Sequence, residues 1–263
     1  MAYEDIVVEK VESWVEISIN RPEKRNALRN QTATELQDAL TEAEKDPSVR
    51  AVIVKSTERG FCAGVDTSDF NVEGSYFQRA HSSRYEFALT RLFRGLADYT
   101  KPIISAIEGY ALGGGFEFAL LGDIIIMDAD AKVGLPEARL GIMPGAGGTQ
   151  TLARLIGKNM AKEIIWTGRF IEAKEAKEIG IANHITAAKE SAEKAREIAR
   201  AIAGKAPISI MFTKQAINRG ADVSLAEGMQ IETGYAFALN FSEDRTEGLK
   251  AFAEKRDPKF KGA

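Results

Sequence analysis

The chain has 263 residues, a formal net charge of −3, 44% hydrophobic residues and 28% charged residues, which suits one large core or two modest ones. Its mild acidity argues against nucleic acid as the main partner, and no apolar run is long enough to span a membrane. The single cysteine, Cys62, excludes an intrachain disulfide and indicates a reducing compartment.

The N-terminal part is predicted to combine strands with one amphipathic helix. Residues 6–10 and 14–19 have the composition of a hairpin, and residues 21–28 that of a loop. A helix over 31–45 would bury one apolar face, formed by Ala33, Leu36, Ala39, Leu40 and Ala43. Residues 49–55 contain a β-branched run that is typical of a buried parallel strand.

Two glycine-bearing turns follow, and the second organises the candidate site. After the first turn, 60–66, we predict a loop over 67–78 and a helix over 84–99. The second turn, 109–120, comes directly after the apolar strand 103–107 and is predicted to begin a helix. Its three consecutive glycines permit positive φ and the close approach of a ligand. The unpaired N–H groups and the dipole at a helix start favour an oxyanion.

Glu117 would lie in the first turn of this helix, where a carboxylate has two interpretations. It is either a helix-start charge that stabilises by about 0.3–1 kcal/mol, or a catalytic acid or base beside an oxyanion pocket. Glu137 follows a proline in the predicted loop 133–141, where most glutamates are simply solvated. Residues 124–127 are predicted to form a short buried strand, and a further glycine-rich loop, 143–149, is predicted to lead into a helix.

The C-terminal part is predicted to be mostly helical. Helical spacing occurs over 158–166, 173–179, 189–203, 207–218, 225–240 and 246–252. We therefore expect an α/β protein with a β/α core over 1–200, which contains the site, and a helical region over 201–263. The many apolar residues of the second region indicate that it packs on something, such as another subunit.

Six segments together resemble the enoyl-CoA hydratase/isomerase (crotonase) superfamily. They occur in order across nearly the whole chain and are 21–28, 60–66, 109–120, 135–141, 144–149 and 251–256. The resemblance implies a crotonase-like repeated ββα superhelix whose C-terminal helical region forms a trimer, usually a dimer of trimers. It also implies an acyl-CoA thioester substrate and no metal or cofactor other than the CoA of that substrate.

The chemistry shared by this superfamily is stabilisation of a thioester enolate by two backbone N–H groups. By resemblance, these donors are Val65, which follows Cys62-Ala63-Gly64, and Gly114, the middle glycine of the second turn. Removing one such donor typically costs about 3 kcal/mol of transition-state stabilisation. Both donors lie in the two glycine-bearing turns, 60–66 and 109–120, that were identified from the sequence pattern.

Members that hydrate enoyl-CoA resemble this chain in having glutamates at the positions of Glu117 and Glu137. Two carboxyl groups suit the addition of water to a conjugated double bond, because one deprotonates the water that attacks Cβ and a proton is delivered to Cα. The division of these roles stays open, since a coupled pair has no separate pKa values. The leading prediction is an enoyl-CoA hydratase that forms a 3-hydroxyacyl-CoA, a reaction of fatty acid β-oxidation.

Three alternatives remain from the sequence. The isomerase branch typically keeps only the later glutamate, whereas the dehalogenase-like branch needs an aspartate where this chain has Gly145. The presence of both glutamates therefore favours a hydratase. The second candidate is an isomerase, or a hydratase for an aromatic or alicyclic acyl-CoA. A non-catalytic RNA-binding relative is a third candidate, against which the acidic charge and the intact glutamate pair argue.

The resemblance also implies a set of substrate and CoA contacts. The candidates are Lys24, Arg25, Ala27, Ala63, Val65, Asp66, Thr67, Ser68, Gly114 and Lys255. Lys24 and Arg25 would suit the phosphates of the nucleotide, and Ala27 and Ala63 would contribute backbone. Lys255 matches a position that in some relatives reaches the CoA of the neighbouring subunit.

The remaining reactive side chains have plainer interpretations. Cys62 has no obvious base partner and is interpreted as a packed residue. His81 and His184 lack metal-ligand spacing and are predicted to lie at the surface. Asp66, beyond its place among the CoA candidates, suits a turn or helix-cap role. Residues 1–5 lack the pattern of a secretion signal, so we expect a cytoplasmic enzyme, or else the mature form of an organellar one.

Overall fold

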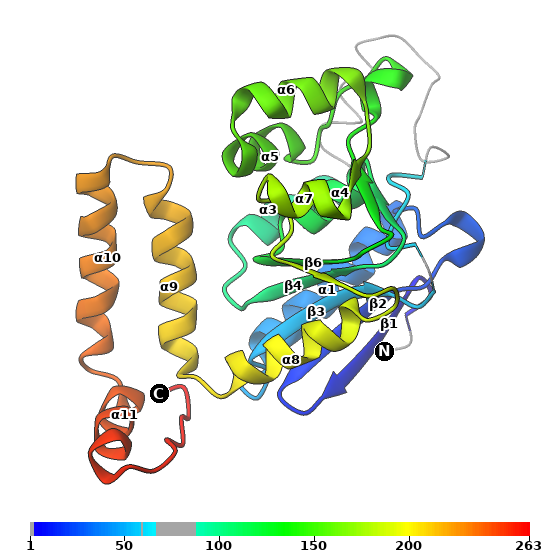
Figure 1. The fold of residues 1–263 in the computed structure, drawn as a ribbon. Coiled ribbons are helices and arrows are strands. Elements are labelled where there is room, and N and C mark those ends of the chain that lie inside the picture. Colours follow the sequence, from blue (N-terminus) through cyan, green and yellow to red (C-terminus); the bar gives the residue numbers. More distant parts are fainter. Residues whose placement is uncertain (1–2, 59, 67–87) are drawn as a thin grey trace.

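The computed structural model describes residues 3–58, 60–66 and 88–263, and its centre is a six-stranded sheet (Figure 1). The strand order is β1-β2-β3-β4-β6-β9. The first pair is antiparallel, and every later pair is parallel. The strands are β1 (Ile6–Val11), β2 (Trp14–Ile19), β3 (Ala51–Ser56), β4 (Ile103–Ile107), β6 (Ile124–Asp128) and β9 (His184–Thr186). The predicted hairpin and repeated parallel crossings are confirmed.

Helices connect these strands, and some of them pack directly on the sheet. They are η1 (Pro22–Lys24), α1 (Asn30–Lys45), α3 (Ala88–Ala97), α4 (Gly114–Leu120), η3 (Glu137–Leu140), α5 (Gly148–Ile156), α6 (Lys158–Thr167), α7 (Ala173–Glu178) and α8 (Ser191–Ala203). The apolar face predicted for the first long helix is confirmed, because its five members are all buried in α1. The predicted loop 67–78 and the start of the predicted helix 84–99 lie outside the described residues.

The core lies on both sides of the sheet, as expected for buried parallel strands. Successive side chains of a strand point to opposite faces. Accordingly, Val52 and Val54 of β3 belong to the core that includes Leu36 of α1, whereas Ile53 belongs to a second core with Ala195 of α8. Layers of helix, sheet and helix hold β4, and therefore the glycine turn that follows it, in a fixed place.

A second, three-stranded sheet corrects the sequence prediction beside the site. Its order is β5-β7-β8, and its strands are β5 (Tyr110–Leu112), β7 (Lys132–Gly134) and β8 (Ile171–Glu172). The chain therefore forms another strand between β4 and the glycines, and the predicted loop 133–141 contains the end of β7 and the 3-10 helix η3. Strands of two or three residues are too short to show an alternating pattern, which explains why they were missed.

Three helices form the C-terminal region: α9 (Pro207–Gly220), α10 (Leu225–Leu239) and α11 (Glu243–Glu254). In Figure 1, α9 and α10 lie side by side at one side of the main sheet, and α11 lies beyond them near the C-terminus. Lys214 of α9 donates to Lys101 O and to Asp123, just before β4 and β6. The predicted helical region is thus observed. Within the part of the chain that the structure describes, no helix has the length and hydropathy needed to cross a membrane.

Candidate active site

The two glycine-bearing turns lie against each other at the start of α4. Leu112 N donates to Cys62 O at 2.9 Å, which ties β5 to the first turn. A Cβ atom on Gly114 would lie 2.7 Å from Val65 Cγ2 and 3.5 Å from Val65 N. The backbones of Val65 and Gly114 can be this close only because Gly114 has no side chain.

The N–H groups of Val65 and Gly114 are both available for a ligand. Leu28 N donates to Gly64 O and Asp66 N donates to Leu28 O, each at 2.8 Å. Because neighbouring amides of an extended segment point to opposite sides, the Val65 N–H faces away from Leu28. Gly114 is the first residue of α4, so its N–H has no acceptor within the helix. Among the described residues, neither N–H donates a hydrogen bond to the protein.

Glu117 is buried in α4, with only 3% of its surface exposed. Its Oε1 accepts hydrogen bonds from Ala146 N and Gly148 N, each at 2.8 Å. Burial raises the pKa of Glu117 above its usual value, while these backbone hydrogen bonds oppose the rise. A Cβ atom on Gly148, the first residue of α5, would lie 2.9 Å from Glu117 Cγ, so a glycine at this position lets the backbone approach the carboxyl group.

Glu137 begins η3 and is also buried, with 8% of its surface exposed. Its Oε2 has no hydrogen-bond partner among the described residues, and its Oε1 lies 3.2 Å from the position of a Cβ atom on Gly113. Burial raises the pKa of Glu137 to about 7, and the nearby charge of Glu117 contributes to the rise. A carboxyl group with such a pKa exchanges protons readily near neutral pH.

The fold therefore brings four of the residues singled out in the sequence into one site. Val65 and Gly114 present two neighbouring amide donors, and Glu117 and Glu137 present two buried carboxyl groups. Two donors can stabilise negative charge that develops on a carbonyl oxygen, and two carboxyl groups can move protons beside it. The sequence pattern did not predict the backbone amides of Ala146 and Gly148 that bind Glu117, although both belong to the predicted glycine-rich loop 143–149.

The CoA candidates among the described residues fall into two groups in space. Loop 24–27 lies beside the first glycine-bearing turn, because Ala63 N donates to Arg25 O at 3.0 Å. Lys24 and Arg25 are exposed there, whereas the Asp66 carboxylate accepts a hydrogen bond from Arg21 at 3.1 Å. Thr67 and Ser68 lie outside the described residues.

Lys255 is the candidate that the structure does not bring to the others. It is exposed and directly follows α11, which belongs to the group of C-terminal helices in Figure 1, whereas α4 lies over the sheets. Within this chain, Lys255 therefore lies apart from the glycine turns.

The predicted structural role of Cys62 fits the packing around it. The side chain is completely buried, and burial raises the pKa of its thiol to about 12. A Cβ atom on Gly115 would lie 2.5 Å from Cys62 Sγ, so the sulfur packs directly on the start of α4. His184 is half-buried in β9, and His81 lies outside the described residues. Among the described residues, no cluster of metal-ligating side chains occurs.

Comparisons with known proteins agree with this geometry. The family model described as enoyl-CoA hydratase/isomerase matches residues 9–263. A human protein named enoyl-CoA hydratase domain-containing protein 2, mitochondrial, is 42% identical over 94% of this chain and 85% of its own. A crotonyl-CoA hydratase of Syntrophomonas wolfei is 38% identical over 99% of both chains. A crystal structure of an enoyl-CoA hydratase from Bacillus anthracis superposes with a TM-score of 0.92 at 39% identity, covering 99% of this chain and 100% of that one. This similarity confirms the expected α/β fold with its C-terminal helical region.

Proposed function

This chain belongs to the enoyl-CoA hydratase/isomerase (crotonase) family, and from this premise we propose that it is an enoyl-CoA hydratase. The reaction would be the reversible addition of water to a trans-2-enoyl-CoA, which gives a 3-hydroxyacyl-CoA. The main support is the pair of buried carboxyl groups of Glu117 and Glu137 beside two neighbouring backbone donors. Both glutamates are needed for hydration in this proposal, and no metal or redox cofactor takes part.

In the proposed mechanism, the thioester oxygen accepts hydrogen bonds from the N–H groups of Val65 and Gly114. These bonds withdraw electrons from the conjugated system and make Cβ electrophilic. They strengthen as negative charge collects on the oxygen in the enolate, so they favour the transition state over the bound substrate. Because both donors belong to the backbone, they are held in place by the turn and by α4.

The two glutamates would handle the protons of one water molecule. One carboxylate takes a proton as the water oxygen bonds to Cβ, and one proton is then placed on Cα of the enolate, so that the elements of water are added in full. Oε2 of Glu137, which is buried and has no hydrogen-bond partner in the described part of the chain, is a suitable acceptor for this water. Oε1 of Glu117 is already fixed by two backbone hydrogen bonds, which orients that carboxyl group.

The binding of CoA and the assembly of subunits belong to the same proposal. We infer that the nucleotide lies along loop 24–27 and turn 63–66, and that Lys255 is supplied by a neighbouring subunit of a trimer or of a dimer of trimers. The region over 201–263 would then serve for oligomerisation. We also propose a cytoplasmic location, whereas the compared human protein is named as mitochondrial.

A panel of short-chain, long-chain, aromatic and alicyclic enoyl-CoAs tests the reaction. We expect loss of the conjugated thioester absorbance and a product heavier by one water. Glu117→Gln and Glu137→Gln should each lower kcat by roughly 10²–10⁴-fold, whereas Glu178→Gln, at an exposed position of α7, should not. An unchanged mass with a moved double bond would indicate an isomerase instead. RNA binding without turnover of any substrate would contradict the enzyme assignment altogether.

A further inference from the structure

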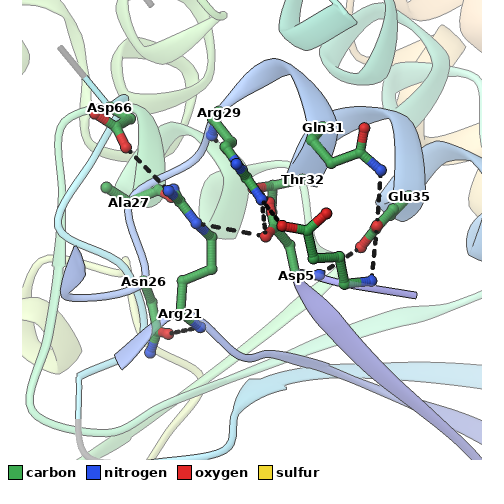
Figure 2. A network of polar contacts seen from close by, with 10 residues as sticks. Asp5, Arg21, Asn26, Ala27, Arg29, Gln31, Thr32, Glu35 and Asp66 are labelled. Carbon is green, nitrogen blue, oxygen red and sulfur yellow. Dashed lines mark hydrogen bonds and ion pairs between the residues drawn. The ribbon is translucent and has the colours of Figure 1, made fainter. Parts of the chain in front are cut away.

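Arg21 is a buried cation at the edge of the candidate site that the proposed chemistry does not use. Only 8% of its side-chain surface is exposed. Figure 2 shows its guanidinium between three segments of the chain. It donates to the backbone oxygen of Ala27 and, at 3.1 Å, to Asp66 Oδ2, and it forms an ion pair of 3.6 Å with Asp5. A buried charge that is paired on every side is held firmly.

The Asp5 side of this network is anchored on α1. Arg29 donates to both oxygens of Asp5, at 2.7 and 2.8 Å, and Thr32 Oγ1 donates to it at 2.6 Å. Burial alone would raise the pKa of Asp5, but these hydrogen bonds and the nearby Arg21 lower it. Asp5 is therefore ionised, and it links Arg21 to the first turn of a long, well-packed helix.

The Asp66 side of the network leads to the oxyanion donor. Asp66 directly follows Val65, and its own N–H donates to Leu28 O at 2.8 Å. At the other end of the same turn, Asn26 Nδ2 donates to Gly60 O at 2.7 Å, while Asn26 Oδ1 accepts from Arg21 N at 2.8 Å. Loop 21–28 thus holds both ends of the turn that carries Val65.

We propose that Arg21 is a positioning residue, which fixes the direction of the Val65 N–H through its contacts with Asp66, Ala27 and Asp5. The inference rests on the proposed function in one respect, namely that an acyl thioester binds with its oxygen at Val65 and Gly114. Without the guanidinium, turn 60–66 keeps its backbone pairing with Leu28 but loses the side-chain link that runs through Arg21 and Asp5 to α1. A small rotation at Val65 would then weaken one of the two hydrogen bonds to the thioester oxygen.

The infrared carbonyl stretch of bound butyryl-CoA, labelled with ¹³C at the thioester carbon, tests this inference. Butyryl-CoA has no double bond to hydrate, so the measurement does not depend on Glu117 or Glu137. In the native protein, two hydrogen bonds should lower the stretching frequency relative to free butyryl-CoA. In Arg21→Met the band should move back toward the free frequency, and in Arg21→Lys, which keeps the charge without the planar fork, the shift should be intermediate.

Turnover provides a second readout. A misplaced donor should lower kcat by about 10- to 100-fold while KM changes little, because the lost hydrogen bond is strongest in the transition state. The matched control is Arg196→Met. Arg196 holds another buried carboxylate, Glu16, at 2.7 Å between α8 and β2, away from the glycine turns. Its loss should lower stability without moving the carbonyl band.

The outcomes separate this inference from the proposed function. If the native protein binds butyryl-CoA without any carbonyl shift, the oxyanion site itself is misassigned, and both proposals fail. If the native protein shifts the band and folded Arg21→Met shifts it equally, only the positioning role is overturned. Should Arg21→Met not fold, the carbonyl band is measured in Arg21→Lys and Asp66→Asn instead. Each of these variants weakens the contact between residues 21 and 66 but keeps a polar group on both sides of it.

Discussion

The carboxyl group of Glu137 has a pKa of about 7, so it can hold or release a proton at neutral pH. Burial is the main cause of its raised pKa, and the Glu117 charge acts in the same direction. The folded state therefore binds this proton more tightly than the unfolded chain does. Such a group imposes a pH dependence on folding as well as on the chemistry of the site.

The free energy of unfolding should fall as pH rises from about 4.5, the usual pKa of this group, to about 7, its pKa in the folded protein. The native state binds more protons in this interval, so raising the pH removes stability, which then levels off above pH 7. One pKa unit corresponds to about 1.4 kcal/mol, so the contribution is roughly 3 kcal/mol.

In Glu137→Gln, the decrease in the free energy of unfolding with rising pH should be smaller by roughly 3 kcal/mol, since the neutral amide does not titrate. Urea unfolding at pH 5 and pH 8 measures the difference, with Glu178→Gln as a surface control. Equal slopes for the native protein and Glu137→Gln would show that Glu137 titrates normally. Part of the slope should remain in Glu137→Gln, because burial raises the pKa of Glu117 too.

At the scale of elements, the close approach of α4 to the first glycine-bearing turn governs the site. The approach requires Gly115, where a Cβ atom would lie 2.7 Å from Cys62 O. A backbone oxygen cannot move aside without shifting the turn that carries Val65. The close contact that brings Val65 and Gly114 together thus leaves no room for one added carbon at Gly115.

Gly115→Ala should lower the free energy of unfolding by about 1–3 kcal/mol through overpacking, although alanine favours helices. The matched control is Gly95→Ala in α3, where no atom of the described residues lies within 4 Å of the added carbon. This control should raise the free energy of unfolding by about 0.5–1 kcal/mol, because alanine restricts the unfolded chain. Chemical denaturation of both variants checks the opposite signs, and stabilisation by both would contradict the packing described for α4.

The sequence predicted the long elements well and the short ones poorly. The apolar face of α1 and the β-branched run of β3 repeat often enough to reveal a period, so their types and buried residues could be predicted. The strands β5, β7 and β8 are formed by pairing across the chain, which no local pattern reveals. For the site, the glycines and glutamates stood out locally, but the contact of Arg21 with Asp66 joins residues 45 positions apart and left no signal.

At the scale of the whole molecule, the helices α9–α11 expose many apolar side chains. Leu225 is 81% exposed and Phe252 is 85% exposed, and Met229, Phe237 and Phe241 are exposed as well. Such a cluster of exposed apolar side chains is unfavourable for an isolated chain in water and is typical of a subunit interface. This exposed apolar surface supports the oligomer that we propose for this chain.

The proposed trimer or dimer of trimers predicts a native mass of three or six chains of 28.7 kDa each. The double variant Met229→Lys/Phe237→Lys places two charges eight residues apart on α10 and should dissociate the oligomer, because buried charges without partners are unfavourable. Light scattering after size exclusion measures the mass. Val8→Lys, at an exposed apolar position of β1, is the control. A native protein that elutes as a single chain would contradict the proposed assembly.

The single thiol of the chain, Cys62, can report on the proposed oxyanion site. Because Cys62 is completely buried and packs on Gly115, reagents that alkylate thiols can reach it only when the turn and α4 separate. The labelling rate then measures how often this part of the molecule opens, in the way that amide exchange does for a backbone proton. A ligand that bridges Val65 and Gly114 would slow the labelling, so its occupancy could be followed without any turnover.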